Sequence, residues 1–176
     1  MKNLPLATEF YLSGNLIRLF HASLNSEYKT IENYEMDFTK KYELFKPNKN
    51  TINQNADIVV FGHLHYHFME KIYGKTLLNC GSVGCSGCPI LKDEYNSNVE
   101  ISNAHYLILS GVLNDTRNGN IEFNFQSVTY DKETEIMDSK NANNIDVGYE
   151  ELLRTGYYPG LPNIMKRISE NGFILL

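Results

Sequence analysis

ADIVVFGHLH, residues 56–65, joins a run of branched apolar residues to a glycine and two histidines in alternate positions. The apolar run has the character of a strand that is buried on both faces, so the histidines would follow its carboxyl end. In an extended segment alternate side chains point to the same side, so His63, His65 and the next histidine, His67, would project together. If the segment is a loop, Gly62 lets the backbone bend close to a bound ion.

The histidine spacing favours a transition-metal ion, because neutral imidazole is a good ligand for zinc, iron, manganese or nickel. His21 is the candidate for a further ligand, since it ends another apolar strand and strands of one sheet often deliver their carboxyl ends to a shared site. The alternative for each histidine is a surface or hydrogen-bonded residue. His67 begins the next predicted strand and can simply cover an edge. His105 opens a strand far from the cluster, and we expect it to be structural.

Three predicted hairpins surround this segment. Glycine and asparagine take the positive φ that hairpin turns require, so residues 9–21 form two strands joined at Ser13-Gly14-Asn15. Residues 67–82 form a second hairpin that turns at Gly74-Lys75. Residues 104–113 and 119–131 form a third around the polar segment 114–120. Strands therefore dominate the middle of the chain.

Helices are predicted on either side of the strands. The aromatic residues of the segment 32–45 recur at intervals of three or four, which predicts an amphipathic helix whose charged residues face water; they are Tyr34, Phe38, Tyr42 and Phe45. Segments 131–138 and 162–170 carry weaker helical patterns. The sequence thus predicts an α/β fold, rich in strands, in which residues 1–176 form a single unit with a helical tail at 131–176.

Composition limits the function. The chain has 176 residues, 42% of them hydrophobic, which suits one folded domain. Its net charge of −5 gives no broad positive field, which argues against a nucleic-acid platform. No apolar run approaches the roughly 18 residues that span a bilayer, and the first ten residues do not form a secretory signal. We therefore expect a cytoplasmic protein with no membrane partner.

The cysteines are few and clustered. Cys80, Cys85 and Cys88 all fall within nine residues, and an odd count suits free thiols in a reducing compartment better than a disulfide framework. One of their spacings is of the zinc-site type, but structural zinc usually takes four ligands. A mononuclear zinc protein that uses cysteine and histidine together stays an alternative.

Linked motifs then point to a family. Residues 56–65, followed by a hairpin and LLNCGSVG (77–84), resemble the C-terminal half of calcineurin-like metallophosphoesterases of the small bacterial and archaeal type. That family shows a strand, Gly-His-x-His, a hairpin and Asn-Pro-Gly-Ser in this order, and Cys80 stands in place of the proline. LIRLFHAS (16–23) resembles the preceding strand with its single metal-binding histidine. The resemblance covers residues 5–130 and implies the C-terminal half of a layered β-sandwich flanked by helices.

The resemblance also implies roles for single residues. His21 and His63 would bind one ion of a dinuclear pair of divalent transition metals, and His65 would bind the other. In such sites the two ions bind the phosphate of a small phosphate ester and generate a hydroxide that attacks it. Asn79, Gly81 and Ser82, with His67, would line or support the substrate pocket.

The family's other motifs are absent. Asp-x-His, Gly-Asp-x-x-Asp and Gly-Asn-His supply its remaining ligands, and none of them occurs in this sequence. Without a bridging carboxylate two adjacent cations repel strongly, so three imidazoles would hold at most one ion, and weakly. The sequence therefore predicts a phosphatase or phosphodiesterase domain with no complete catalytic set, inactive alone.

Two further expectations follow. Removing half of a layered fold exposes strand edges, which an N-terminal half or a second copy of the chain would cover. The alternative function is a binding or scaffold module that derives from the same fold and has lost catalysis.

Overall fold

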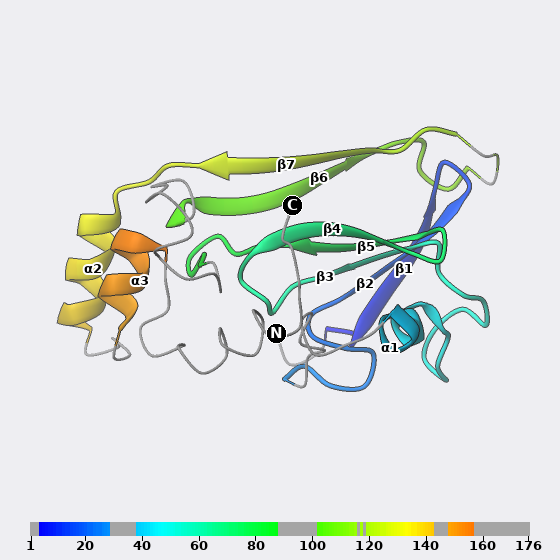
Figure 1. Ribbon diagram of the computed structural model, residues 1–176, viewed down its shortest axis with the longest axis horizontal. Coiled ribbons are helices and arrows are strands. Elements are labelled where there is room, and N and C mark those ends of the chain that lie inside the picture. The colour runs from blue at the N-terminus through cyan, green and yellow to red at the C-terminus, as the bar shows by residue number, and fades with distance from the viewer. Residues whose placement is uncertain are drawn as a thin grey trace.

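The computed structural model describes residues 4–28, 38–87, 102–115, 117, 119–142 and 148–156. Strands are the main regular secondary structure of this part of the chain, as Figure 1 shows. The elements are β1 (Ala7–Leu12), β2 (Asn15–Phe20), α1 (Phe38–Tyr42), the 3₁₀ turn η2 (Glu43–Phe45), β3 (Ile58–Phe61), β4 (His67–Ile72), β5 (Lys75–Cys80), β6 (Ala104–Ser110), β7 (Glu122–Val128), α2 (Lys132–Asn141) and α3 (Tyr149–Thr155). The predicted strand-rich α/β class is confirmed.

The larger sheet has five strands in the order β1-β2-β3-β5-β4. Its three central strands run parallel, and β1 and β4 are antiparallel strands at the two edges. The hairpins predicted at residues 9–21 and 67–82 are confirmed as β1-β2 and β4-β5. The second turn lies one residue earlier than predicted, at Tyr73 and Gly74, which both have positive φ, while Lys75 already belongs to β5.

Strand β3 is the centre of the core. All four of its residues are buried, which confirms the prediction of a strand covered on both faces. On one face Val59 and Phe61 pack with residues of α1, η2 and β5, and on the other Ile58 and Val60 pack with the apolar residues of β6 and β7. The continuous apolar run of residues 58–61 is therefore explained by two covering layers.

The second sheet is the β6-β7 hairpin, which covers one face of the larger sheet (Figure 1). Backbone hydrogen bonds join it to the β1-β2 turn: Ser13 N–H donates to the Val112 carbonyl at 2.8 Å, and Gly14 N–H donates to the Asp115 carbonyl at 2.8 Å. The Val112 N–H in turn donates to Ser13 Oγ at 3.0 Å. We call this set of bonds the turn latch. It holds the two sheets together at one end.

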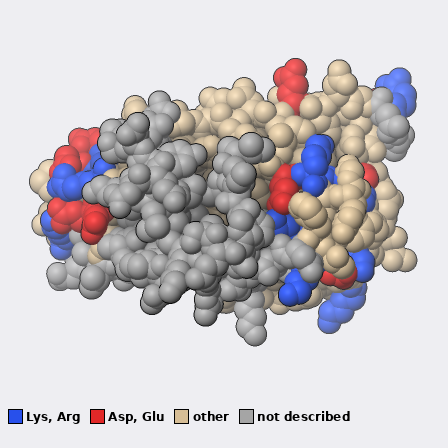
Figure 2. Space-filling model, viewed as in Figure 1, with Lys and Arg blue, Asp and Glu red and all other residues tan. Residues whose placement is uncertain are grey.

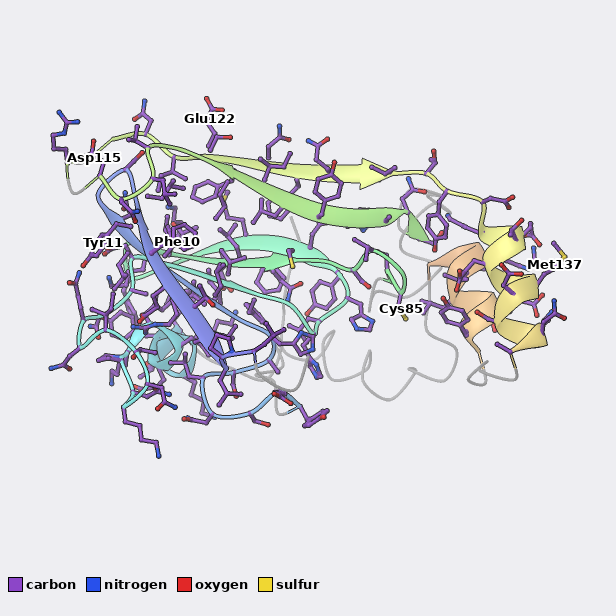
Figure 3. All side chains as sticks on the ribbon, turned by 180° about the vertical axis from the view of Figure 1, so that it is seen from behind. Phe10, Tyr11, Cys85, Asp115, Glu122 and Met137 are labelled. Carbon is purple, nitrogen blue, oxygen red and sulfur yellow. The ribbon has the colours of Figure 1, made fainter. Side chains whose placement is uncertain are left out.

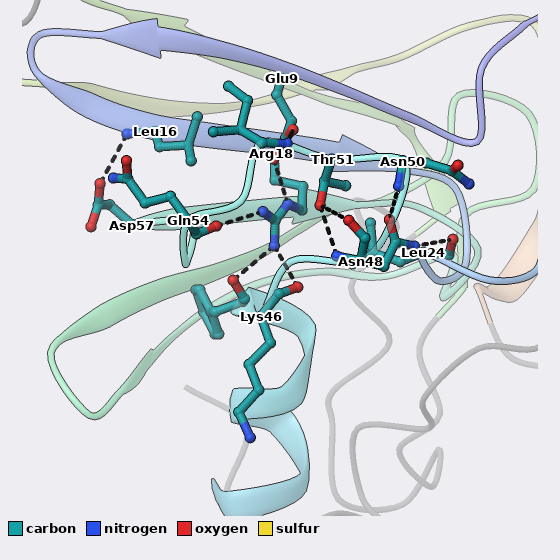
Figure 4. Close-up of polar contacts among 12 residues, drawn as sticks. Glu9, Leu16, Arg18, Leu24, Lys46, Asn48, Asn50, Thr51, Gln54 and Asp57 are labelled. Carbon is teal, nitrogen blue, oxygen red and sulfur yellow. Dashed lines mark hydrogen bonds and ion pairs between the residues drawn. The ribbon is translucent and has the colours of Figure 1, made fainter.

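Arg18 is a buried charge inside the larger sheet. Its side chain is fully buried and donates hydrogen bonds to the Glu9 carboxylate and to three backbone carbonyls (Figure 4), those of Phe45, Lys46 and Gln54. These bonds tie the segment 45–54 to β2. A charge at this depth is tolerated because its donors have partners.

The predicted helix at 32–45 is only partly described. Residues 38–45 form α1 and η2, while Tyr34 lies outside the described residues. The expectation that its charged residues face water is wrong for Lys41, which is 1% exposed. Its ammonium group is 2.7 Å from the Glu70 carboxylate of β4, so a cross-element ion pair replaces the solvent.

Two short helices, α2 and α3, are the last elements of the described residues. α2 confirms the prediction at residues 131–138, and Asp131 caps it by accepting a hydrogen bond from the Thr134 N–H. α3 lies within the predicted helical tail of residues 131–176 but outside its two predicted helical segments, and the segment 162–170 lies outside the described residues. Figure 2 shows positive and negative side chains intermixed at the α2–α3 end. Among the described residues no helix has the length and apolar character to cross a membrane.

Candidate metal centre

The candidate site lies at the carboxyl ends of β2 and β3. These strands are parallel neighbours, with Phe20 opposite Phe61, so the residues that follow them meet at one edge of the sheet. The Gly62 N–H donates to the His21 carbonyl at 2.9 Å, which extends the pairing by one step. The side chains of His21 and His63 therefore start from adjacent backbone positions.

The two histidines face each other. His63 Nδ1 is 3.2 Å from His21 Nε2, and the rings are perpendicular with centroids 5.1 Å apart. The predicted bend in the backbone occurs at His63, whose φ is +67°, rather than at Gly62. The absence of a side chain at Gly62 leaves space for the His21 ring, since a Cβ there would lie 3.3 Å from His21 Nδ1. A positive φ in a non-glycine residue stores strain, and such strain clusters at functional sites.

Asn79 holds the loop that carries His63. Its side chain is fully buried, Nδ2 donates to the Gly62 carbonyl at 2.6 Å, and Oδ1 accepts from the Gly81 N–H at 3.0 Å. Asn79 and Gly81, which the resemblance assigned to the substrate pocket, thus form the support beneath the His63 loop. The Asn79 side-chain amide and the Gly81 N–H form hydrogen bonds within the protein.

His65 lies next to the pair and is half-buried. Burial lowers the pKa of His65, and the imidazoles of His63 and His21 lower it further, while a hydrogen bond with the Cys85 backbone opposes the shift. Burial, and then His21, also lower the pKa of His63. Both shifts favour neutral imidazole, which is the form that binds a metal ion.

The other predicted residues lie elsewhere. His67 belongs to β4, and its ring contacts those of His105, at 4.7 Å between centroids, and Phe125, at 5.2 Å. The expectation that His63, His65 and His67 project together from one extended segment is therefore wrong, because residues 62–66 form a loop before β4 begins. His105 is buried between the sheets, as a structural role requires.

Ser82 forms a tight turn after β5. Its Oγ accepts a hydrogen bond from the Cys85 N–H at 3.0 Å, and its carbonyl accepts from the His105 N–H at 2.8 Å. The turn also contacts α3, because the Tyr149 hydroxyl donates to the Gly84 carbonyl at 3.1 Å. No local sequence signal indicates this contact, because the two residues lie 65 positions apart.

The described cysteines are free thiols. Burial raises the pKa of the Cys80 thiol, whose Sγ donates to the Phe61 carbonyl at 3.5 Å, so Cys80 is a poor nucleophile and a poor metal ligand here. Cys88, the third member of the alternative zinc site, lies outside the described residues.

The spacing of the two facing imidazoles can be compared with the spacing of metal ligands. Two imidazole nitrogens bound at about 2.05 Å to one tetrahedral ion stand about 3.3 Å apart, close to the 3.2 Å between His63 Nδ1 and His21 Nε2. This spacing matches two positions around one ion, and it is also the spacing of a hydrogen bond between the two rings. Within the described ranges no group of three or more His, Cys, Asp or Glu side chains is arranged to hold a metal. Further ligands would have to come from elsewhere.

Comparisons with known proteins support the fold. No protein-family model matches the sequence, and no curated protein matches it significantly. Among solved structures, a hypothetical protein from Pyrococcus horikoshii OT3 is similar with a TM-score of 0.59 at 14% identity, over 88% of this chain and 52% of that one. A metallophosphoesterase from Sphaerobacter thermophilus is similar with a TM-score of 0.54 at 15% identity, over 88% of this chain and 59% of that one.

Both matches are partial in the same sense. The chain spans between half and three fifths of the length of each of these two structures. Because the sequence identity to both structures is low, the similarity supports a conclusion about the fold alone. The fold of this chain is metallophosphoesterase-like.

Proposed function

We propose that this chain carries part of the active centre of a metal-dependent phosphoesterase that hydrolyses a small phosphate ester. The observation that supports the proposal most strongly is the facing pair His21 and His63, which extends from the ends of two parallel strands at metal-ligand spacing. The metallophosphoesterase-like fold supports it further. A bound pair of divalent transition ions, such as manganese, iron, zinc or nickel, would polarise the phosphate and activate water.

The histidines of this chain would have defined tasks in that centre. His21 and His63 would hold one ion, and His65 would contribute to the second. Asn79 would keep His63 in place through its hydrogen bond to the Gly62 carbonyl. This is a positioning role, because the Asn79 side chain itself is buried and contacts backbone groups.

We propose that a separate polypeptide segment supplies the missing carboxylate, asparagine and histidine ligands. The strand pairing leaves room for it. Among the described residues β1, β4, β6 and β7 each have one ladder partner, and most of the other edge of each strand has no strand beside it. Loop residues bond to that edge near one end of β1, where the Asn114 N–H donates to the Tyr11 carbonyl, and of β6, where the His105 N–H donates to the Ser82 carbonyl. Unpaired edges accept further strands. A complementary segment would complete both the sheet and the metal centre, within a cytoplasmic protein that keeps its thiols reduced.

Cobalt titration tests the metal-binding part of the proposal. Co²⁺ should bind the purified chain weakly, with one ion per chain, and produce the visible absorption of a cobalt–imidazole complex. His63→Gln should weaken binding by about tenfold or more, since the loss of an outer-shell partner of a metal ligand already costs about 10–100-fold. His67→Gln removes a histidine outside the pair and is the matched control. Equal binding by the two variants would contradict the proposed ligands.

Hydrolysis of a chromogenic phosphodiester in the presence of Mn²⁺ tests the catalytic part. The chain alone should be inactive, and adding a segment that carries the Asp-x-His and Gly-Asn-His motifs should produce turnover that His63→Gln abolishes. Turnover by the chain alone at the rate of an intact phosphoesterase would show that the catalytic set is already complete. A stable complex with an unrelated protein and no turnover would favour the scaffold alternative.

A further inference from the structure

A pocket of about 300 Å³ opens at the end of the sheets opposite the histidines. The parallel strands β2, β3 and β5 begin at this end, and the antiparallel strand β4 finishes there. Figure 3 labels Asp115 at this end and Cys85 at the other. The wall on the larger sheet includes Asn15, Asp57 and Thr76, and Asn120 and Phe123 line it from the β6-β7 side.

The charged groups of the pocket come from three positions. Lys75 Nζ is 3.1 Å from Asp57 Oδ1, and the other oxygen of Asp57 accepts a hydrogen bond from the Leu16 N–H at 2.9 Å. Both oxygens of this carboxylate are therefore engaged. Lys71 Nζ donates to the Thr76 hydroxyl at 2.6 Å. In the described part of the chain no carboxylate forms an ion pair with Lys71.

The pocket thus carries two ammonium groups and one carboxylate, in a chain whose net charge is −5. The contact between Lys71 and Thr76 joins directly opposed residues of β4 and β5, which places this ammonium group at the pocket wall. A neutral hydroxyl does not compensate the charge, and an ammonium group can donate three hydrogen bonds. The site therefore offers a positive charge and further donors in a pocket that the exposed residue Asn120 also lines.

We propose that this pocket binds a small oxyanion, the phosphate or carboxylate group of a small molecule, with Lys71 as its main charged donor. Lys75 adds positive potential while it stays paired with Asp57. A volume of about 300 Å³ is at the lower end of the range for small-molecule pockets, so the ligand is a compact one. The pocket and the histidine pair lie at opposite ends of the strands, so this inference does not rest on the proposed function.

Nuclear magnetic resonance of the ¹⁵N-labelled chain tests the pocket. Inorganic phosphate is titrated at constant ionic strength, and the amide signals of Gly74, Lys75, Thr76 and Asn120 should shift together and saturate. Acetate in a second titration distinguishes a carboxylate ligand from a phosphate ligand, and saturation with either ion supports the site. Shifts that stay linear with both ions would overturn it, since they report ionic screening alone.

Two variants with the same change of charge provide the comparison. Lys71→Gln should weaken anion binding by about tenfold, the size expected for loss of one charge-assisted hydrogen bond. Lys49→Gln removes an exposed lysine that does not line the pocket and should leave the affinity unchanged. The spectra also report whether each variant is folded. Equal affinities of the two folded variants would refute the role of Lys71.

Discussion

Gly81 is the residue whose substitution tests most directly how the histidine loop is supported. Its φ of +79° lies in the left-handed region, and an added Cβ would stand 2.8 Å from the His105 Cβ, a distance that real Cβ atoms essentially never show. Gly74, in the β4-β5 turn, has a similar φ of +82°, but a Cβ there would meet nothing within 4 Å. Gly81→Ala and Gly74→Ala therefore introduce similar backbone strain, but only Gly81→Ala also introduces a steric clash.

The expected magnitudes follow from these two terms. Alanine in the left-handed region costs about 1 kcal/mol, which is the loss of unfolding free energy expected for Gly74→Ala. Overpacking adds about 1–3 kcal/mol, so Gly81→Ala should lose about 2–4 kcal/mol. With a urea m-value of about 2 kcal/mol/M, the midpoints should fall by about 0.5 M and about 1–2 M.

Urea unfolding followed by circular dichroism measures both variants, with equal m-values as the check on two-state behaviour. The close atom is the His105 Cβ, so adding His105→Ala should not relieve the clash in Gly81→Ala. Equal midpoints for the two glycine variants would refute the reasoning. Rescue by His105→Ala would show that the imidazole ring, rather than the Cβ, causes the loss.

Other predictions concern buried polar groups. Arg18→Met leaves three backbone carbonyls and the Glu9 carboxylate without their donor, and should cost about 3–5 kcal/mol in urea unfolding; a loss below 1 kcal/mol would contradict this. Asn79→Ala orphans one buried carbonyl and one N–H and should cost about 2–4 kcal/mol; an unchanged urea midpoint would show that water replaces the amide. Burial and the nearby Glu135 carboxylate raise the pKa of Tyr149 to about 12. The pKa of a tyrosine in the unfolded chain is about 10, so the stability due to Tyr149 should be intact below pH 10 and lost as the pH rises towards 12. Tyrosinate absorbance should show this late titration in the wild type and not in Tyr149→Phe; its persistence in the variant would refute the assignment.

The sequence predicted the elements whose signals are local. The turn residues at Ser13–Asn15 defined the β1-β2 hairpin, and the branched run at 58–61 defined a strand with two covered faces. The position of His21 and His63 after parallel strands also follows from local patterns, because the ends of such strands meet at one edge.

The contacts that could not be predicted depend on residues far apart in the sequence. The helical pattern predicts that Lys41 faces solvent. The fold instead pairs it with Glu70, which lies 29 positions away in the sequence. Asn79 carries the motif of a pocket residue, but its side chain lies beneath Gly62, since the β3-β5 register places Asn79 opposite Phe61. His67 follows the histidine alternation, yet β4 begins there and turns it towards Phe125.

The turn latch has a consequence for folding kinetics. It joins Ser13 to Val112, which are 99 positions apart, so its formation closes a long loop at an entropic cost of about 4 kcal/mol. Contacts of such separation form late, after the local hairpins. Weakening the latch should therefore speed unfolding far more than it slows folding, so the lifetime of the native state should depend on the end of the sheets opposite the histidines.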